Sequence, residues 1–288
     1  MEFIAILKAS PAWLAAAAAL LGLCVGSFLN VVIYRLPKMM EAQWRAECAE
    51  FEGREPPPRE PFNLLRPRSR CPECAAPIGA AQNIPVVSWL LLRGKCAACK
   101  APISARYPAV ELLAGALAAL AAWRFGYSTA LLPALICLWA LVALTFIDLD
   151  TQLLPDDITL PLLWLGLIAN AFSIFTDLRS ALWGAVGGYL LLWTVYWAFR
   201  LLTRKEGMGY GDFKLLAAIG AWTGWQVLPA VIVISAGLGA VIGSLALWLT
   251  RRGADTRIPF GPYLALGGIA GLLWGRELVV AWLGHFPM

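Results

Sequence analysis

The stretch "PAWLAAAAALLGLCVGSFLNVVI", residues 11–33, contains no charged residue. A helix needs about 20 consecutive apolar residues to cross the hydrocarbon core of a bilayer, so this stretch predicts a membrane-spanning helix. Lys8 precedes it, which is also typical of a cleavable signal peptide. Because the stretch is longer than the apolar core of a signal peptide and lacks a clear cleavage site, we expect a transmembrane helix of the mature protein.

The same apolar character returns along the whole chain. Of its 288 residues, 60% are hydrophobic and 14% are charged, whereas soluble domains are about 45–50% apolar and about 25% charged. We therefore predict an all-α polytopic membrane protein with about eight transmembrane helices. Seven is the alternative, because three of the apolar segments are short. The seven segments after the first are residues 110–123, 129–147, 158–175, 181–202, 213–225, 228–249 and 260–274.

The charged residues predict the domains and the orientation. Between residues 37 and 106 the sequence is polar and rich in proline, so we expect a transmembrane helix in residues 1–36, a small cytoplasmic domain in 37–106 and a helical bundle in 107–288. With eight spans, 19 of the 23 Lys and Arg residues lie on one side, which should be cytoplasmic. The net charge of +5 thus reflects membrane orientation, and no nucleic-acid partner is expected.

Two pairs of cysteines in the polar region have the spacing of a zinc site. Cys71 and Cys74 form one C-x-x-C motif, and Cys96 and Cys99 form a second. Four thiolates from two such turns can bind one Zn²⁺ tetrahedrally, which leaves no open position for catalysis. A redox-active pair or four unconnected thiols would be alternatives, but a cytoplasmic location disfavours disulfides. We expect a structural zinc.

Several aspartates lie at the ends of predicted helices. Asp148 is at a helix C-terminus, where the helix dipole disfavours an anion, so another group must stabilise it. Asp212 follows a glycine-rich loop, "GMGYGD", and under the predicted topology it lies on the same membrane face as Asp148. Asp156 and Asp157 open the next helix after Asp148, and they can act simply as helix caps.

Two neighbouring carboxylates in a medium of low dielectric constant share one proton, and such a pair can activate water and protonate a leaving amine. Asp148 and Asp212 could form such a pair, with the glycines allowing close approach of a substrate. Asp212 could equally be an N-cap residue. Nothing in these patterns establishes that the two helices touch.

The motifs together resemble those of the bacterial type IV prepilin peptidases, which are bifunctional leader peptidase/N-methyltransferases and GxGD-type membrane aspartic proteases. The resemblance extends over nearly the whole chain and implies that Asp148 and Asp212 are the catalytic aspartates, with Asp150 and Asp156 in supporting positions. It places the zinc ligands at Cys71, Cys74, Cys96 and Cys99. The matching stretches are "GSFLNVVIYRLPKM", the two cysteine pairs, "RYPAVELL", "IDLDTQLLPD", "ITLPLLWLGL", "KEGMGYGDFKLLAAIGAW" and "IPFGPYLALGG".

This resemblance also implies the substrates, the second reaction and the compartment. The expected substrates are type IV prepilins and type II secretion pseudopilins, cleaved at the cytoplasmic face of the bacterial inner membrane. The new N-terminus would then be methylated with S-adenosyl-L-methionine. No glycine-rich nucleotide fingerprint assigns a site for that donor. Glu111 is a candidate to accept the proton of the amine, although it could be a helix-start carboxylate balanced by Arg106. His285, the single histidine, is expected to be an incidental tail residue.

Two other functions remain compatible with the residues themselves. A transporter could relay protons or cations through intramembrane acids, but such acids should lie near the bilayer midplane, whereas these lie at helix ends. A zinc-stabilised scaffold for pilus or secretion assembly would need no pair of acids at all.

Overall fold

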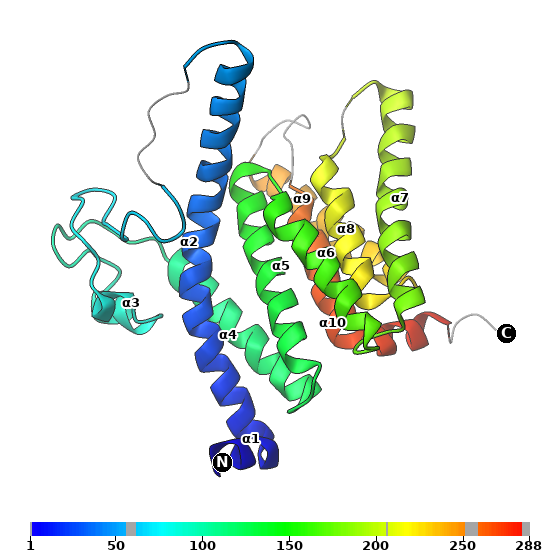
Figure 1. Cartoon of the computed structure of the whole chain (residues 1–288), viewed down its shortest axis with the longest axis horizontal. Helices are drawn as coiled ribbons and strands as arrows, with labels where there is room; N and C mark the ends of the chain where they lie inside the picture. Colours follow the sequence, from blue (N-terminus) through cyan, green and yellow to red (C-terminus); the bar gives the residue numbers. More distant parts are fainter. Residues whose placement is uncertain (1, 56–61, 206, 251–258, 284–288) are drawn as a thin grey trace. The chain divides into compact units, whose positions relative to one another are not determined.

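A computed structural model describes residues 2–55, 62–205, 207–250 and 259–283 (Figure 1). Within those residues the secondary structure is helical, with two isolated β-bridges and no β-strand, so the predicted all-α class is confirmed. The chain forms two compact units, residues 1–127 and 128–288. His285 lies outside the described residues, as do Arg251, Arg252 and Arg257, which contributed to the predicted charge asymmetry.

The first unit is built on one long helix. It contains α1 (Glu2–Ala9), α2 (Pro11–Phe51), the 3₁₀ helix η1 (Ala80–Asn83), α3 (Val87–Leu91) and α4 (Arg106–Phe125). Ser10 caps α2, since its side chain accepts a hydrogen bond from the Trp13 N–H (3.4 Å). The helix then passes through Pro37 without ending and continues for fourteen further residues.

Helix α2 thus continues past residue 36, where the first predicted domain ends. Beyond Pro37 the segment "MMEAQWRAECAEF" contains many good helix formers and the i,i+4 ion pair between Arg45 and Glu41, so the helix propagates past the membrane segment. The second predicted boundary, at residue 106, coincides with the start of α4, but α4 packs on α2 in the same unit.

Helices α2 and α4 approach each other closely along small residues. A methyl group added at Gly22 would lie 2.6 Å from the Ala114 carbonyl oxygen, and one added at Gly26 would lie 2.6 Å from the Glu111 Cα. Glycines spaced four residues apart let two helix backbones pack directly against each other, as is common for helices in membranes. Gly22 and Gly26 therefore allow α2 and α4 to pack with their backbones in contact.

In the part of the second unit that the structure describes, six helices form a bundle. Its helices are α5 (Leu131–Thr151), α6 (Asp156–Ala171), α7 (Leu178–Thr203), α8 (Tyr210–Thr223), α9 (Leu228–Thr250) and α10 (Gly261–Leu283). Helix α8 lies between α6 and α7 in Figure 1, and it also contacts α9 and α10. From Leu215 to Thr223 every residue of α8 is buried. Protein, rather than lipid, therefore surrounds this short helix.

Glycines bring α7 and α8 into backbone contact. A methyl group at Gly188 would lie 2.7 Å from the Leu216 carbonyl oxygen, and one at Gly184 would overlap the carbonyl of Gly220. On the opposite side, α6 is fixed to the C-terminal end of α8 by polar contacts. The Trp222 indole N–H donates to the Leu162 carbonyl (2.8 Å), and the Asn170 amide donates to the Ala221 carbonyl (2.8 Å).

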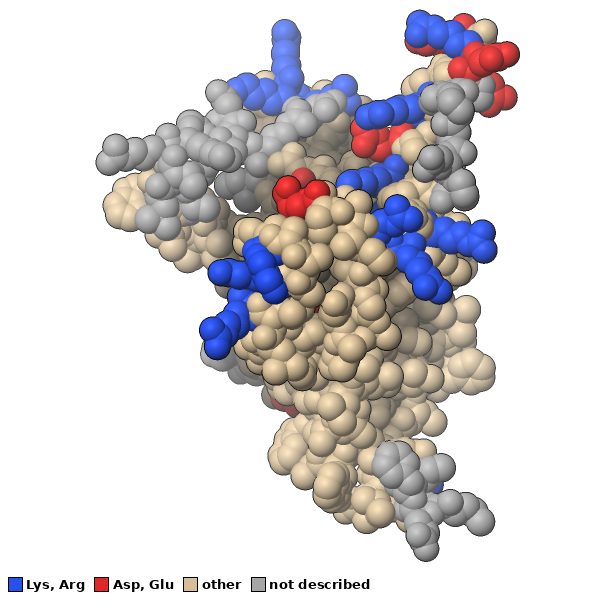
Figure 2. Space-filling view, turned by 90° about the vertical axis from the view of Figure 1, so that its left-hand side faces the viewer, with Lys and Arg blue, Asp and Glu red and all other residues tan. Residues whose placement is uncertain are grey.

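Six of the described helices are long and apolar enough to cross a membrane, namely α2, α4, α5, α7, α9 and α10. The fourth and sixth predicted spans correspond to α6 and α8, which have 16 and 14 residues. At 1.5 Å per residue they extend about 24 and about 21 Å, less than the roughly 30 Å of the hydrocarbon core. On the face drawn in Figure 2, broad areas carry no charged side chain, as expected of a surface in lipid.

Candidate active site and candidate metal centre

Asp148 lies in the last turn of α5 and is 5% exposed. Its carboxylate oxygen Oδ2 accepts a hydrogen bond from the Gly261 N–H (2.9 Å). Gly261 is the first residue of α10, so the positive end of that helix points at the carboxylate. Asp148 was expected to need a stabilising group because it lies at a helix C-terminus. The Gly261 N–H is that group.

Asp212 lies in the first turn of α8 and is 7% exposed. The residue in the N-cap position is Gly209, with extended backbone, and the Asp212 Oδ2 accepts a hydrogen bond from its N–H (3.2 Å). The interpretation of Asp212 as the N-cap residue is thus wrong by three positions, although its carboxylate does reach back to the helix start. A buried carboxylate at a helix N-terminus meets the favourable end of the dipole.

Asp148 and Asp212 lie beside the same loop, each bonded to a backbone N–H at the start of a helix, Asp148 at α10 and Asp212 at α8. Leu154, in the loop between α5 and α6, lies against the glycines beside both aspartates. A methyl group at Gly211 would be 2.7 Å from the Leu154 Cβ, and one at Gly261 would be 3.2 Å from the Leu154 Cδ2. Helices α5 and α8 carry the two aspartates, and sequence patterns could not show that they are close. The structure places the aspartate of each helix near this loop.

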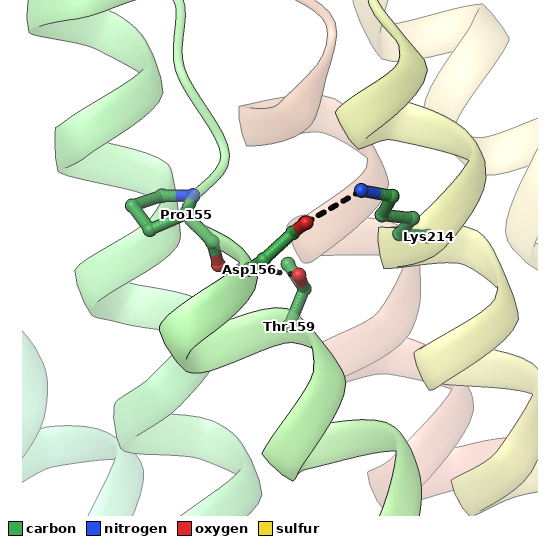
Figure 3. A network of polar contacts seen from close by, with 4 residues as sticks. All are labelled: Pro155, Asp156, Thr159 and Lys214. Carbon is green, nitrogen blue, oxygen red and sulfur yellow. Dashed lines mark hydrogen bonds and ion pairs between the residues drawn. The ribbon is translucent and has the colours of Figure 1, made fainter. Parts of the chain in front are cut away.

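The other aspartates of this region have different surroundings. Asp150 and Asp157 are exposed. Asp156 forms an ion pair with Lys214 of α8, whose Nζ lies 2.7 Å and 2.8 Å from the two carboxylate oxygens (Figure 3). The N-cap residue of α6 is Pro155, so Asp156 and Asp157 occupy the first turn and favour the helix through its dipole.

Gly261 is a residue of the candidate site that sequence reasoning missed. It lies in the stretch "IPFGPYLALGG", and a glycine followed by proline is a helix-start signal. The sequence could not show that this N–H donates to Asp148, because Asp148 lies 113 residues earlier in the chain. A methyl group at this position would lie 2.6 Å from the Asp148 Oδ2, so any side chain here would displace the carboxylate or the helix start.

The four predicted metal ligands are gathered in the first unit. The Sγ atoms of Cys71, Cys74, Cys96 and Cys99 all lie within 4.8 Å of one another. The Sγ atoms of Cys71 and Cys99 are 3.8 Å apart. Four sulfurs at about 2.3 Å from a tetrahedral Zn²⁺ would be about 3.8 Å from one another. The thiol positions therefore fit zinc.

Both cysteine turns have the same backbone conformation. The stretches "RCPECAAP", residues 70–77, and "KCAACKAP", residues 95–102, each close with an antiparallel bridge between their first and last residues. In each, the first cysteine donates its N–H to a carbonyl five residues later (2.9 and 2.8 Å). Ala75 and Lys100 each have positive φ, at 57° and 63°. The chain therefore contains one turn twice, and the repeat is visible in the sequence.

The backbone around the thiols favours the ionised form that binds metal. The N–H groups of Cys99 and Ala98 lower the pKa of Cys96 to about 6. The pKa of Cys99 is raised to about 11, because the favourable Ala101 N–H is outweighed by desolvation and by the neighbouring thiols. Closely spaced thiols disfavour one another's ionised form. A divalent cation bound to all four removes this effect, because its charge stabilises the thiolates.

Glu111 lies on α4 and is 8% exposed. Its carboxylate oxygen Oε2 accepts a hydrogen bond from the Val86 N–H (2.7 Å). Val86 has φ of 60°, an unusual conformation for a β-branched residue, and the charged acceptor helps to offset its strain. Glu111 therefore holds the loop before α3 against α4, and its part in methyl transfer stays a prediction.

Comparison with known proteins gives the family. Residues 20–125 match the family described as "Bacterial Peptidase A24 N-terminal domain", and residues 135–244 match the "Type IV leader peptidase family". A curated "Prepilin leader peptidase/N-methyltransferase" from Stutzerimonas stutzeri is 54% identical over 284 residues, covering 98% of both chains. Proteins of the same name are 53% identical in Pseudomonas aeruginosa and 46% identical in Legionella pneumophila.

Those two alignments cover 92% and 93% of this chain, and 91% and 93% of the respective relatives. No solved structure matches the chain. With about half of its residues identical to these relatives over nearly its entire length, the chain belongs to the type IV leader peptidase family.

Proposed function

We propose that this protein cleaves the short basic leader from type IV prepilins and type II secretion pseudopilins and then N-methylates the new N-terminus. The names of the relatives indicate both reactions. The observation that carries the proposal is the pair of buried aspartates, Asp148 and Asp212, whose neighbouring glycines, Gly261 and Gly211, both lie against Leu154. The chain is accordingly an enzyme of the aspartic endopeptidase class.

The geometry suits hydrolysis by two carboxylates. One member of the pair takes a proton from a water molecule, which attacks the scissile carbonyl, while the other donates a proton to the leaving amine. The Gly261 N–H holds Asp148, and the Gly209 N–H holds Asp212, so each carboxylate has one oxygen fixed and the other left for water or substrate. The glycines before Asp212 allow an extended substrate to approach the backbone.

The four cysteines would hold a structural Zn²⁺ with Cys71, Cys74, Cys96 and Cys99 as its ligands. The support is the fit of their Sγ atoms to a tetrahedral site. With four protein ligands the ion has no open position, so it stabilises the two duplicated turns and supplies no chemistry to either reaction.

Methyl transfer would use S-adenosyl-L-methionine as the donor. An α-amino group has a pKa near 8, so an acceptor that removes its proton makes it nucleophilic. Glu111 is our candidate for that acceptor, because it is a buried carboxylate in the second turn of α4. Which residues bind the donor is left unassigned.

The protein is a multi-pass membrane protein, and we place it in the bacterial inner membrane. The predicted distribution of Lys and Arg puts the cysteine turns and both aspartates on the cytoplasmic side. A substrate helix inserted with its basic leader in the cytoplasm would then present the scissile bond at the level of the aspartates. The transporter hypothesis has no support among the relatives, whose names are those of peptidases.

The test is cleavage of a prepilin by the purified protein in detergent or liposomes. Asp148→Asn and Asp212→Asn should each lower the rate by about 100-fold or more, since only one of the two carboxylates remains. Asp157→Asn, an exposed aspartate at the start of α6, is the matched control and should cleave normally. Cleavage by either Asn variant of the pair at close to the wild-type rate would disprove the assignment. Both variants should still methylate a pre-cleaved substrate.

A further inference from the structure

An ion pair connects α6 with α8, the helix that carries Asp212. Lys214 of α8 donates to both carboxylate oxygens of Asp156 of α6, at 2.7 and 2.8 Å. Figure 3 shows the two side chains reaching toward each other from facing helices, with Asp156 directly after Pro155. The residues are 58 positions apart in sequence, so this contact sets a tertiary arrangement and not a local one.

The location of Lys214 is unfavourable without a partner. It lies near the N-terminus of α8, where the helix dipole opposes a cation, whereas Asp156 lies in the first turn of α6, where the dipole favours an anion. The side chains are 32% and 50% exposed, and pairs of this kind typically stabilise a protein by only about 0–1 kcal/mol. The pair therefore adds little to the overall stability. Its main effect is to hold the start of α6 against the start of α8.

Those helix starts border the candidate active site. Lys214 follows Asp212 by two residues, and Asp156 follows Leu154 by two residues. Leu154 in turn lies against Gly211 and Gly261, the glycines adjacent to Asp212 and bonded to Asp148. A movement of the start of α6 would thus shift Leu154 and change the space between the two carboxylates.

The opposite ends of the same helices are held separately. The Asn170 amide and the Trp222 indole connect α6 to the C-terminal end of α8, and both side chains are buried. Loss of the ion pair would therefore leave α6 docked on α8 at its far end while releasing its near end. The expected consequence is a change at the site without unfolding of the bundle.

We propose that Lys214 and Asp156 are positioning residues of the peptidase reaction. Their ion pair holds the α5–α6 loop between Gly211 and Gly261 and thereby sets the separation of Asp148 and Asp212. The proposal rests on the proposed function, because its consequence is read in the rate of cleavage. Neither residue is required to touch the substrate, so the turnover step and not substrate binding should respond.

The experiment compares Asp156→Asn, Lys214→Met and the charge swap Asp156→Lys/Lys214→Asp. In prepilin cleavage by the purified proteins, each single variant should lower kcat about tenfold, in line with coupling within a contacting network, and leave KM within about twofold. Asp156→Asn should be the slower of the two, since it leaves a lysine alone at a helix start. The swap should recover kcat to within about threefold of wild type, because the attraction between the two positions is restored.

Arg45→Met with Glu41→Gln, which removes an ion pair on α2, is the matched control and should leave kcat unchanged. Single variants that turn over at the wild-type rate would overturn the proposal, and so would a swap no faster than the single variants. Thermal unfolding distinguishes positioning from general destabilisation, since a merely structural pair would not change kcat in folded protein. If the wild-type protein itself fails to cleave, the proposed function falls, and the role of the pair falls with it.

Discussion

The contact between Gly261 and Asp148 leads to a prediction about a single methyl group. Gly261→Ala keeps the backbone N–H that donates to the Asp148 Oδ2, so it tests the space around the carboxylate and not the hydrogen bond. The added Cβ would lie 2.6 Å from Oδ2 and 3.1 Å from the Asp148 Cγ. Ordinary van der Waals contact begins at 3.4 Å, so the carboxylate or the start of α10 must move by 0.8 Å or more.

The size of this movement determines the expected loss of activity. Misplacement of a reacting group by about 1 Å can cost on the order of 100-fold in rate. We therefore expect Gly261→Ala to lower kcat for prepilin cleavage by roughly 10- to 100-fold, with a smaller change in KM, because the substitution affects the reacting carboxylate and not the substrate contacts.

The assay is cleavage of a purified prepilin by wild type and variant at equal concentration in the same detergent, with thermal unfolding measured in parallel. Gly237→Ala in α9 is the control, since a methyl group there would meet nothing within 4 Å. If Gly261→Ala cleaved as fast as Gly237→Ala, the carboxylate position would not limit the reaction, and the reasoning from this contact would be refuted. A loss of folded protein would be visible in the unfolding curve.

Two further predictions concern the metal centre and the core of the second unit. Replacing Cys71 and Cys74 by serine should reduce bound zinc from one equivalent to none and lower the unfolding temperature, measured by metal analysis and thermal melting, while Cys48→Ser on α2 should change neither; retention of the zinc would contradict the four-thiolate site. Gly184→Ala should destabilise the protein by about 1–3 kcal/mol, because its methyl group would overlap the Gly220 carbonyl of α8. Gly187→Ala on the same helix, with its nearest neighbour 3.9 Å away, should be almost neutral in the same unfolding assay, and equal melting of both variants would contradict the close packing of α7 and α8.

Sequence patterns were most informative where residues close in sequence also act together. The two C-x-x-C turns predicted a four-cysteine cluster, which the first unit contains. The apolar segments predicted the helices, but length alone did not show that α8 would be enclosed by protein. Its fourteen residues extend only about 21 Å, and the neighbouring helices bury it.

Contacts between distant residues required the structure. That Asp148 needed a stabilising group followed from its place at a helix end, but the Gly261 N–H could not be identified from sequence. Lys214 was counted only as one of the basic residues that define the orientation, and Asp156 only as a supporting or capping acid. Their pairing depends on how α6 and α8 pack, which propensities and periodicity do not specify.

The position of Gly261 also bears on how the enzyme is made. Helices α5 and α8 carry the two aspartates, but the N–H that holds Asp148 belongs to α10, which leaves the ribosome after them. A nascent chain that has inserted everything up to α9 would have both acids yet lack the donor for one of them. If the two aspartates act as proposed, cleavage would therefore require α10 to be in place as well as the two helices that carry the acids.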